Sequence, residues 1–206
     1  MSIRKFELTT EFITVFGIKL FRIRALIAFG NIEVGELGGF VEKEENLSHD
    51  NRAWISGNAR IWGNAKISGD ARISGNARIS GDARISGNAR ISGNAEIWGN
   101  AEISGDAEIW GNAEISGNAE IWGDAEISKP SHVLVIGALG SRNGFTTFFK
   151  SKSKEILVKC GCFNNNIDEF EKAVTEEHSG TKHEKTYKAA IALAKLQIEL
   201  NESEEN

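Results

Sequence analysis

Isoleucine recurs every sixth residue through the middle of the chain, thirteen times from Ile55 to Ile127, with an alanine two positions before each one. Because successive side chains of a strand point to opposite faces, alanine and isoleucine share one face and the residue between them lies on the other. A helix is disfavoured, since a period of six does not fit its turn and a glycine in every unit would cost about 1 kcal/mol. The pattern predicts one short strand in each six-residue unit.

Each of the first twelve units closes with Ser or Trp, then Gly, then Asn or Asp. Glycine and asparagine tolerate the positive φ that a tight corner needs. One such strand cannot bury its apolar side alone, but stacked coils can bury it continuously. Residues 51–128 are therefore predicted to form a β-solenoid.

This pattern, with aliphatic and small residues at fixed positions, resembles the hexapeptide repeat of left-handed β-helices. The resemblance implies left-handed coils of three units, so that residues 51–128 would make about four coils of eighteen residues and a stub of roughly 20 Å. That family includes acyltransferases with a catalytic histidine and γ-type carbonic anhydrases with three histidine ligands. The repeat here contains no histidine. We therefore expect neither activity and lean away from an enzyme, with a hexapeptide acyltransferase as a less favoured alternative.

Both ends of the chain depart from the repeat. Within residues 1–50, positions 5–26 predict two strands around Gly17, followed by glycine-rich coils that cap the open solenoid. The stretch "LFRIRALIAFGNIEVGELGGF" and the later "IGALGSRNGFTTFFKS" resemble segments of hexapeptide-repeat proteins from bacteriophages and prophages. The resemblance implies a phage or prophage setting, with the host cytoplasm as the compartment, but no settled activity.

After a linker at 128–131, the chain predicts a small α/β domain over residues 131–200. Three strands are expected in "HVLVIGA", "GFTTFFK" and "EILVKCG". Asn166 with Glu169 three residues later is a capping-box pattern, which predicts a helix over 167–178. A second helix is expected over 182–200 and a loose acidic tail over 201–206. The fold class is thus mainly β, a left-handed solenoid with an N-terminal β cap and a C-terminal β3α2 domain.

The composition of the chain limits the compartment and the kinds of partner that we expect. The 206 residues carry a net charge of −5, and no long apolar run occurs. We therefore expect no membrane span and no secretion signal, and we expect the protein to lie in the cytoplasm. The negative net charge also argues against a nucleic-acid partner. Cys160 and Cys162 are the only cysteines. They read as core residues more readily than as zinc ligands or a nucleophile, and no metal or cofactor is expected.

Three groups in the C-terminal domain are candidates for a binding site. The loop at Gly137–Gly144 and the segment before the first helix offer small and polar groups and a helix N-terminus that attracts anions, and His183 and Tyr187 share a helical face. Together they predict a pocket for an anionic small molecule such as a nucleotide, to be captured rather than turned over. Two alternatives stay open: a plain hairpin turn with surface polarity, and a docking module without a ligand. The candidate ligand-binding residues are Ser141, Arg142, Asn143, Asn164, Asn165, Asn166, His183 and Tyr187.

The outward charge of the repeat changes sign once. Six basic residues from Arg60 to Arg90 are followed by six acidic ones from Glu96 to Glu126. Residues eighteen apart should stack, which puts Arg60, Arg78, Glu96 and Glu114 in one column. Two copies packed antiparallel would then pair Arg78 with Glu96 and Arg60 with Glu114, with exposed Trp62 and Trp98 as possible anchors. A parallel trimer is the alternative oligomer, and a remnant of repeat duplication would also explain the pattern.

Overall fold

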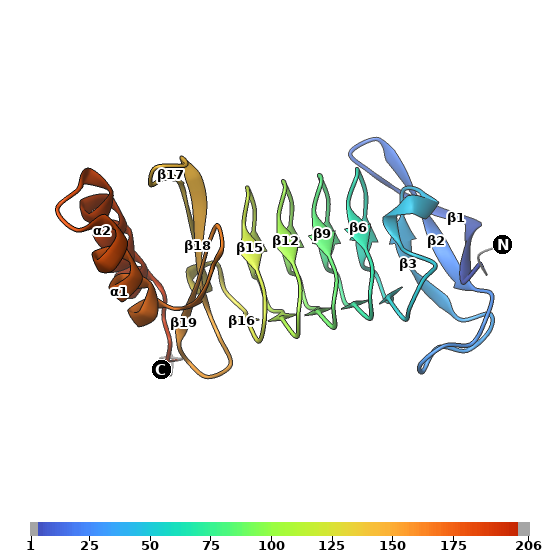
Figure 1. The fold of residues 1–206 in the computed structure, drawn as a ribbon. Helices are drawn as coiled ribbons and strands as arrows, with labels where there is room; N and C mark the ends of the chain where they lie inside the picture. Colours follow the sequence, from blue (N-terminus) through green and yellow to red (C-terminus); the bar gives the residue numbers. More distant parts are fainter. Residues whose placement is uncertain (1–3, 202–206) are drawn as a thin grey trace, which may run out of the picture.

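The computed structural model describes residues 4–201. In Figure 1 the molecule is a rod, with the N-terminal strands at one end, stacked coils in the middle, and a small sheet covered by two helices at the other end. Residues 202–206 of the predicted acidic tail lie outside the described residues. Within residues 4–201, no helix is both long and apolar enough to span a membrane.

The coils are made of thirteen two-residue strands, one for each isoleucine of the repeat. They are β4 (Trp54–Ile55), β5 (Arg60–Ile61), β6 (Lys66–Ile67), β7 (Arg72–Ile73), β8 (Arg78–Ile79), β9 (Arg84–Ile85), β10 (Arg90–Ile91), β11 (Glu96–Ile97), β12 (Glu102–Ile103), β13 (Glu108–Ile109), β14 (Glu114–Ile115), β15 (Glu120–Ile121) and β16 (Glu126–Ile127). We name the three faces of the coil after the strands that stack on them. Face A holds β5, β8, β11 and β14; face B holds β6, β9, β12 and β15; face C holds β4, β7, β10, β13 and β16.

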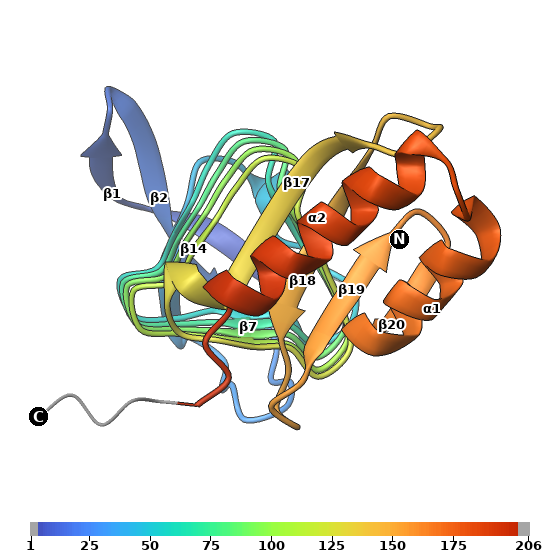
Figure 2. The ribbon, with the colours of Figure 1, turned by 90° about the vertical axis from the view of Figure 1, so that its left-hand side faces the viewer.

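The register is parallel, and each pair joins residues eighteen apart. On face A, for example, Arg60 lies beside Arg78, and Arg78 beside Glu96. The alanine and isoleucine of every unit are buried inside the coil. Seen from the C-terminal end, the chain passes from face C at the bottom of Figure 2 to face A on the left and then to face B, while it advances toward the viewer. This is the left-handed winding that the resemblance implied.

From Gly57 to Gly111 the glycine of each unit lies close to the backbone that follows it in the stack, whereas Gly117 and Gly123 of the last coil have open space beside them. Gly87, for example, has φ +67°, and a Cβ built on it would lie 2.6 Å from the backbone nitrogen of Gly105. Any other residue there would combine an unfavourable backbone conformation with a collision against main chain. The repeat therefore keeps glycine at this corner for geometric reasons.

The N-terminal segment adds to the ladder of face A. β1 (Phe6–Val15) and β2 (Ile18–Ala25) form the predicted hairpin, and β3 (Leu37–Val41) pairs antiparallel with β2 and parallel with β5. After the 3₁₀ turn η1 (Glu44–Asn46), Leu47 forms a bridge with Ile67 on face B. These residues occupy repeat positions although their sequence lacks the six-residue pattern. The solenoid therefore has about five turns, one more than the repeat alone predicted.

The C-terminal segment forms a separate sheet. η2 (Pro130–His132) stands where a linker was predicted, and β17 (Val133–Leu139), β18 (Gly144–Lys150), β19 (Ile156–Cys160) and β20 (Phe163–Asn166) follow as an antiparallel meander. The prediction of three strands missed β20, which pairs Phe163 with Cys160 across a tight turn. The helices α1 (Ile167–His178) and α2 (Lys182–Gln197) follow, the first with the predicted bounds and the second three residues shorter at its end.

This sheet lies between the last coil and the two helices (Figures 1 and 2). Along its strands, alternate side chains point toward the last coil and toward the helices. Phe149 and Leu157 join the apolar cluster that runs through the solenoid, whereas Phe148 and Val158 pack with α1 and α2. The period of two in β18 and β19 thus builds both contacts from one sheet.

Candidate functional site

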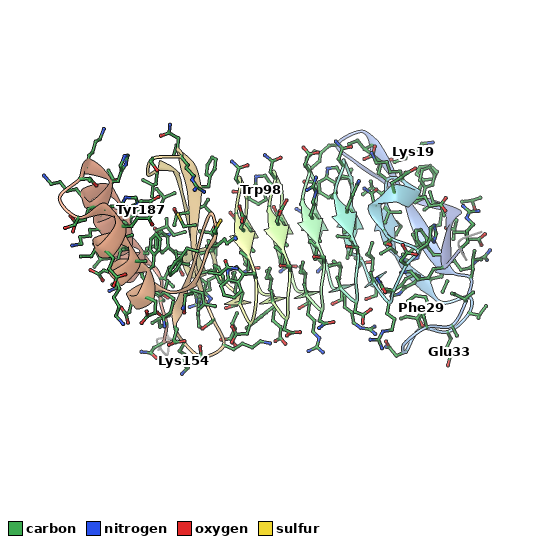
Figure 3. The ribbon with its side chains drawn as sticks, viewed as in Figure 1. Lys19, Phe29, Glu33, Trp98, Lys154 and Tyr187 are labelled. Atoms are coloured by element: carbon green, nitrogen blue, oxygen red, sulfur yellow. The ribbon has the colours of Figure 1, made fainter. Side chains whose placement is uncertain are left out.

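A pocket of about 330 Å³ opens at the far corner of the C-terminal domain, between the tips of two hairpins and the junction of α1 with α2. Figure 3 labels Tyr187 of α2 between the helices and the sheet. The lining of the pocket comes from four segments that the meander and the two helices bring together. The lining residues are Leu139, Ser141, Arg142, Gly144, Phe145, Cys160, Gly161, Cys162, Phe163, Phe170, Ala173, Val174, Glu177, His178 and Tyr187.

Tyr187 is fixed at the base of this pocket. Its ring packs edge-on against Phe170, with centroids 5.6 Å apart, and stacks on His178, also at 5.6 Å. A Cβ at Gly140, whose φ is +70°, would collide with the tyrosine hydroxyl, so the turn before Ser141 requires glycine. Burial, together with a hydrogen bond to Cys160, raises the pKa of Tyr187 to about 12. Its hydroxyl therefore stays protonated at neutral pH and can donate a hydrogen bond to a ligand.

The rim of the pocket carries one cation and one anion. Arg142 is exposed at the tip of the β17–β18 hairpin, next to Ser141. Glu177 of α1 is also exposed and lines the same opening. The remaining walls include the aromatic rings of Phe145, Phe163 and Phe170. A flat ring with a small acidic group would match such a lining.

The predicted site residues do not all meet in this pocket. Ser141, Arg142 and Tyr187 line it. Asn143 belongs to the same turn, with φ +48°, but does not line the pocket, and neither does His183, whose ring lies 5.9 Å from that of His178.

The three asparagines lie elsewhere. Asn164, Asn165 and Asn166 lie in the strand β20, so the segment before the first helix is not a loop. Asn166 caps α1, since its side chain accepts a hydrogen bond from the backbone nitrogen of Glu169 at 3.0 Å. This local role accounts for the capping pattern and leaves Asn166 outside the pocket lining.

Sequence reasoning placed Cys160 and Cys162 in the core, which the structure corrects. Cys160 is half-buried and lines the pocket, while Cys162 is exposed in the turn between β19 and β20, because the strand ends at Cys160. Thr146 donates a hydrogen bond to the Cys160 sulfur at 3.2 Å, and the thiol lies 3.8 Å from the Tyr187 hydroxyl. Neither neighbour is a base at neutral pH. In residues 4–201 no group of three or more His, Cys, Asp or Glu side chains is arranged to hold a metal.

The charge switch of the repeat forms a ring of ion pairs around one junction between coils. Arg78 and Glu96 pair at 2.8 Å on face A, Arg84 and Glu102 at 3.2 Å on face B, and Arg90 and Glu108 at 3.3 Å on face C. These contacts are exposed and individually weak. They place the sign change between adjacent coils on all three faces.

Lysines of the C-terminal sheet lie against the acidic coils on two of the faces. Lys159 is 3.7 Å from Glu120 on face B, and Lys152 is 3.0 Å from Glu108 on face C. The buried Lys150 lies 3.6 Å from Glu126, also on face C. On face A, Glu114 makes no ion pair among the described residues. The acidic half is thus partly neutralised on faces B and C by the domain that closes it.

Of the two tryptophans predicted to be exposed, Trp98 is exposed and Trp62 is not. Trp98 is 38% exposed on face A. Trp62 is half-buried, with its ring 6.5 Å from that of Phe16 at the hairpin tip, and Trp122 packs edge-on against Phe149. The two caps explain this burial, because each covers the coil nearest to it.

One family model matches part of the repeat. It is described as the YdcK Beta solenoid repeat and matches residues 71–83 and 83–97. The match supports a repeating β-helix and lies wholly inside the solenoid. A comparison with curated proteins finds none that matches the chain.

Proposed function

We propose that this protein is a non-catalytic binding protein in which the solenoid is a rigid scaffold and the C-terminal pocket captures an anionic small molecule such as a nucleotide. The observation that carries the proposal is the pocket of about 330 Å³ at the tip of the C-terminal sheet. It combines an exposed guanidinium, a phenol that stays protonated, and aromatic walls. Such a mixture of apolar surface and a few convergent polar groups is typical of small-molecule sites.

Each group has a role in this proposal. Arg142 would pair with a phosphate or carboxylate, since its planar fork matches those anions. The Tyr187 hydroxyl and Ser141 would orient the ligand through hydrogen bonds. The rings of Phe145 and Phe163 would stack on a base. Glu177 at the rim favours a ligand with one or two negative charges over a highly charged one, because its carboxylate repels additional charge.

The phage or prophage resemblance gives the proposal a biological setting. A protein that sequesters a nucleotide signal without consuming it would serve counter-defence in the host cytoplasm. This part of the proposal depends on the resemblance of the chain ends alone.

The test is binding to the purified full chain, first by mass spectrometry of small molecules released on denaturation and then by thermal shift against a nucleotide panel. A ligand present at 100 times its dissociation constant should stabilise the protein by about 2.7 kcal/mol. Absence of any released molecule and of any shift across the panel would overturn small-molecule capture.

Arg142→Ala should weaken binding of the ligand found in this way by about 1.5–3 kcal/mol, the contribution of a charged hydrogen bond, as measured by calorimetry. Lys185→Ala is the matched control, because Lys185 is an exposed cation of α2 outside the pocket lining. Equal affinity of the Arg142 variant and wild type would place the site elsewhere.

A docking or structural module without a ligand is the second candidate. It is favoured by the way the C-terminal sheet closes the solenoid, with Phe149 and Leu157 in the apolar cluster of the coils. Under that function, substitutions at Phe149 would alter folding, while Arg142→Ala would change no measurable property of the isolated chain.

A further inference from the structure

Face A differs from the other two faces of the solenoid in what covers it. On faces B and C, lysines of the C-terminal sheet lie over the acidic coils, and on face C Asn31 accepts a hydrogen bond from Arg72 at 2.6 Å. On face A the outward column is Arg60, Arg78, Glu96 and Glu114. Apart from the pair Arg78–Glu96, these four side chains make no ion pair with any described residue. Arg78 and Glu114 are exposed on this face, whereas Arg60 and Glu96 are half-buried. Arg60 and Glu114, which form no ion pair with any described residue, are the charges that another molecule could complement.

A second column on face A lies two residues further along each strand. It consists of Trp62, Ser80, Trp98 and Ser116, so that bulky and small side chains alternate from coil to coil. Trp98 is the exposed tryptophan of the solenoid, and Phe16 at the neighbouring hairpin tip is 89% exposed. Exposed aromatic residues of this kind are enriched at the centres of protein interfaces.

We propose that face A is the contact surface of an antiparallel dimer of this chain. A two-fold axis that runs along the strands midway between β8 and β11 places β8 against the partner's β11 and β5 against the partner's β14. Arg78 then faces the partner's Glu96, and Arg60 faces the partner's Glu114, while each pair is repeated by symmetry. The same axis sets Trp98 over the partner's Ser80 and Trp62 over the partner's Ser116, so each large ring meets a small side chain.

The alternatives fit the surface less well. A parallel arrangement stacks arginine on arginine and tryptophan on tryptophan. A nucleic acid would meet the acidic half, which repels phosphate. The junction pair Arg78–Glu96 is compatible with the dimer, because two such pairs related by the axis form an alternating square of charges. Phe16, beside Trp62, would reach the partner near Ser116.

The first test is sedimentation of the full chain at about 0.05 M and about 0.5 M salt. We expect a dimer whose dissociation constant rises about tenfold or more at high salt, since the paired charges are exposed. A chain that is monomeric at both salt concentrations, a trimer, or a dimer that tightens with salt would overturn the proposal.

The second test exchanges charges on the face. Arg60→Glu/Arg78→Glu makes the column wholly acidic, and Glu96→Arg/Glu114→Arg makes it wholly basic. Each variant alone should be monomeric, a mixture of the two should form a one-to-one complex, and the fourfold exchange should restore the dimer. Lys66→Glu/Arg84→Glu on face B is the matched control, because it also breaks one junction ion pair. A face B variant that dissociates like the face A variant would overturn the assignment of the face.

A milder substitution guards against misfolding. Trp98→Ala removes an exposed ring, so we expect unchanged thermal unfolding of the monomer and a dimer weakened about tenfold or more. An unchanged dimer would show that this face is not the contact.

Discussion

The two ends of the solenoid are closed by different physical means. At the N-terminal end the chain continues the hydrogen-bond ladder: β3 pairs with β5, and donors of the cap reach carbonyl oxygens of the first coil. At the C-terminal end the sheet β17–β20 contributes no strand to the faces; it meets the coil backbone at the bridge of Ala125 with Ser151 and at Thr147, whose hydroxyl accepts a hydrogen bond from the backbone nitrogen of Glu120 at 3.0 Å. Closure there depends on buried side chains such as Phe149. Both caps place apolar side chains in the cluster of the coils, Phe6 and Ile23 at one end and Phe149 and Leu157 at the other. The ends differ in the backbone ladder, which continues into strand β3 of the N-terminal cap and is not continued by any strand of the C-terminal sheet.

This difference shows that the end of a β-solenoid has to be closed in two respects, its backbone hydrogen bonds and its apolar interior. The edge of the terminal coil has backbone N–H or C=O groups without a hydrogen-bond partner. Its open end would also expose the last isoleucines of the apolar interior to water. The N-terminal cap satisfies the first with Asn46 and Lys5, both buried, which donate to carbonyls of the first coil. Both caps cover the apolar interior, the N-terminal one with side chains such as Phe6 and Ile23 and the C-terminal one with Phe149 and Leu157. The comparison predicts that substitutions at the two ends will fail in different ways.

The largest effect is expected from Phe149→Ala at the C-terminal end. The ring is fully buried and packs against Trp122, so its loss should lower the free energy of unfolding by about 3–5 kcal/mol. Denaturant unfolding measures the loss, and amide exchange should rise in the last coil. Phe148→Ala, on the helix side of the same strand, should destabilise the domain without that rise. Equal exchange in the last coil for both variants would contradict apolar closure.

A smaller effect is expected from Asn46→Ala at the N-terminal end. The Asn46 amide nitrogen donates to the carbonyl oxygens of Ala65 at 2.8 Å and Gly63 at 3.2 Å, both of which would lose their partner. The free energy of unfolding should fall by about 1–3 kcal/mol, with faster amide exchange in the first coil only. Asn58→Ala, at an exposed corner, is the control and should change stability by about 0.5 kcal/mol or less. If the two variants are equally stable, polar closure is not what holds this end.

The smallest effect sharpens the comparison through pH. Lys5 is buried, and its ammonium donates to the carbonyl oxygen of Ala53 at 2.9 Å. Burial lowers the pKa of Lys5 to about 8 from its ordinary value of 10.5. Between those two values the unfolded chain binds more protons than the folded chain, so the free energy of unfolding rises with pH in this window.

The variant Lys5→Met should lose that rise. We expect the stability difference between wild type and Lys5→Met to shift in favour of wild type between pH 7.5 and pH 10, as followed by denaturant unfolding. Lys185→Met, which changes an exposed lysine, should show no such shift relative to wild type. Parallel pH curves for wild type and Lys5→Met would show that the buried ammonium does not titrate in this window.

The repeat could be predicted from sequence because every unit has the same pattern of apolar, charged and glycine positions. A period of six with alanine and isoleucine inside predicts strands and corners, the resemblance to hexapeptide β-helices implies the eighteen-residue register, and the structure has all three. The extra N-terminal turn was not predictable in this way. Phe40 and Leu47 occupy repeat positions through tertiary pairing, without a periodic pattern around them.

The candidate site shows where sequence reasoning ends. Arg142 and Tyr187 were identifiable from a glycine-rich loop and a helical face, and both line the pocket. The asparagine run was misplaced because Phe163–Asn166 pairs as a strand, against the low strand propensity of asparagine. Phe145, Phe163 and His178 are brought together from three elements, and no local pattern signals that meeting.

The three-sided coil also has a consequence for insertions and deletions. Removal of eighteen residues would shorten the rod by one coil, about 4.8 Å, and leave the pocket pointing in the same direction relative to the N-terminal hairpin. Removal of six residues would instead rotate the pocket by a third of a revolution and carry every later charge to a different face. In this protein the number of repeat units therefore sets both the length of the rod and the rotation of one cap relative to the other. Gain or loss of a number of units that is not a multiple of three would change that rotation.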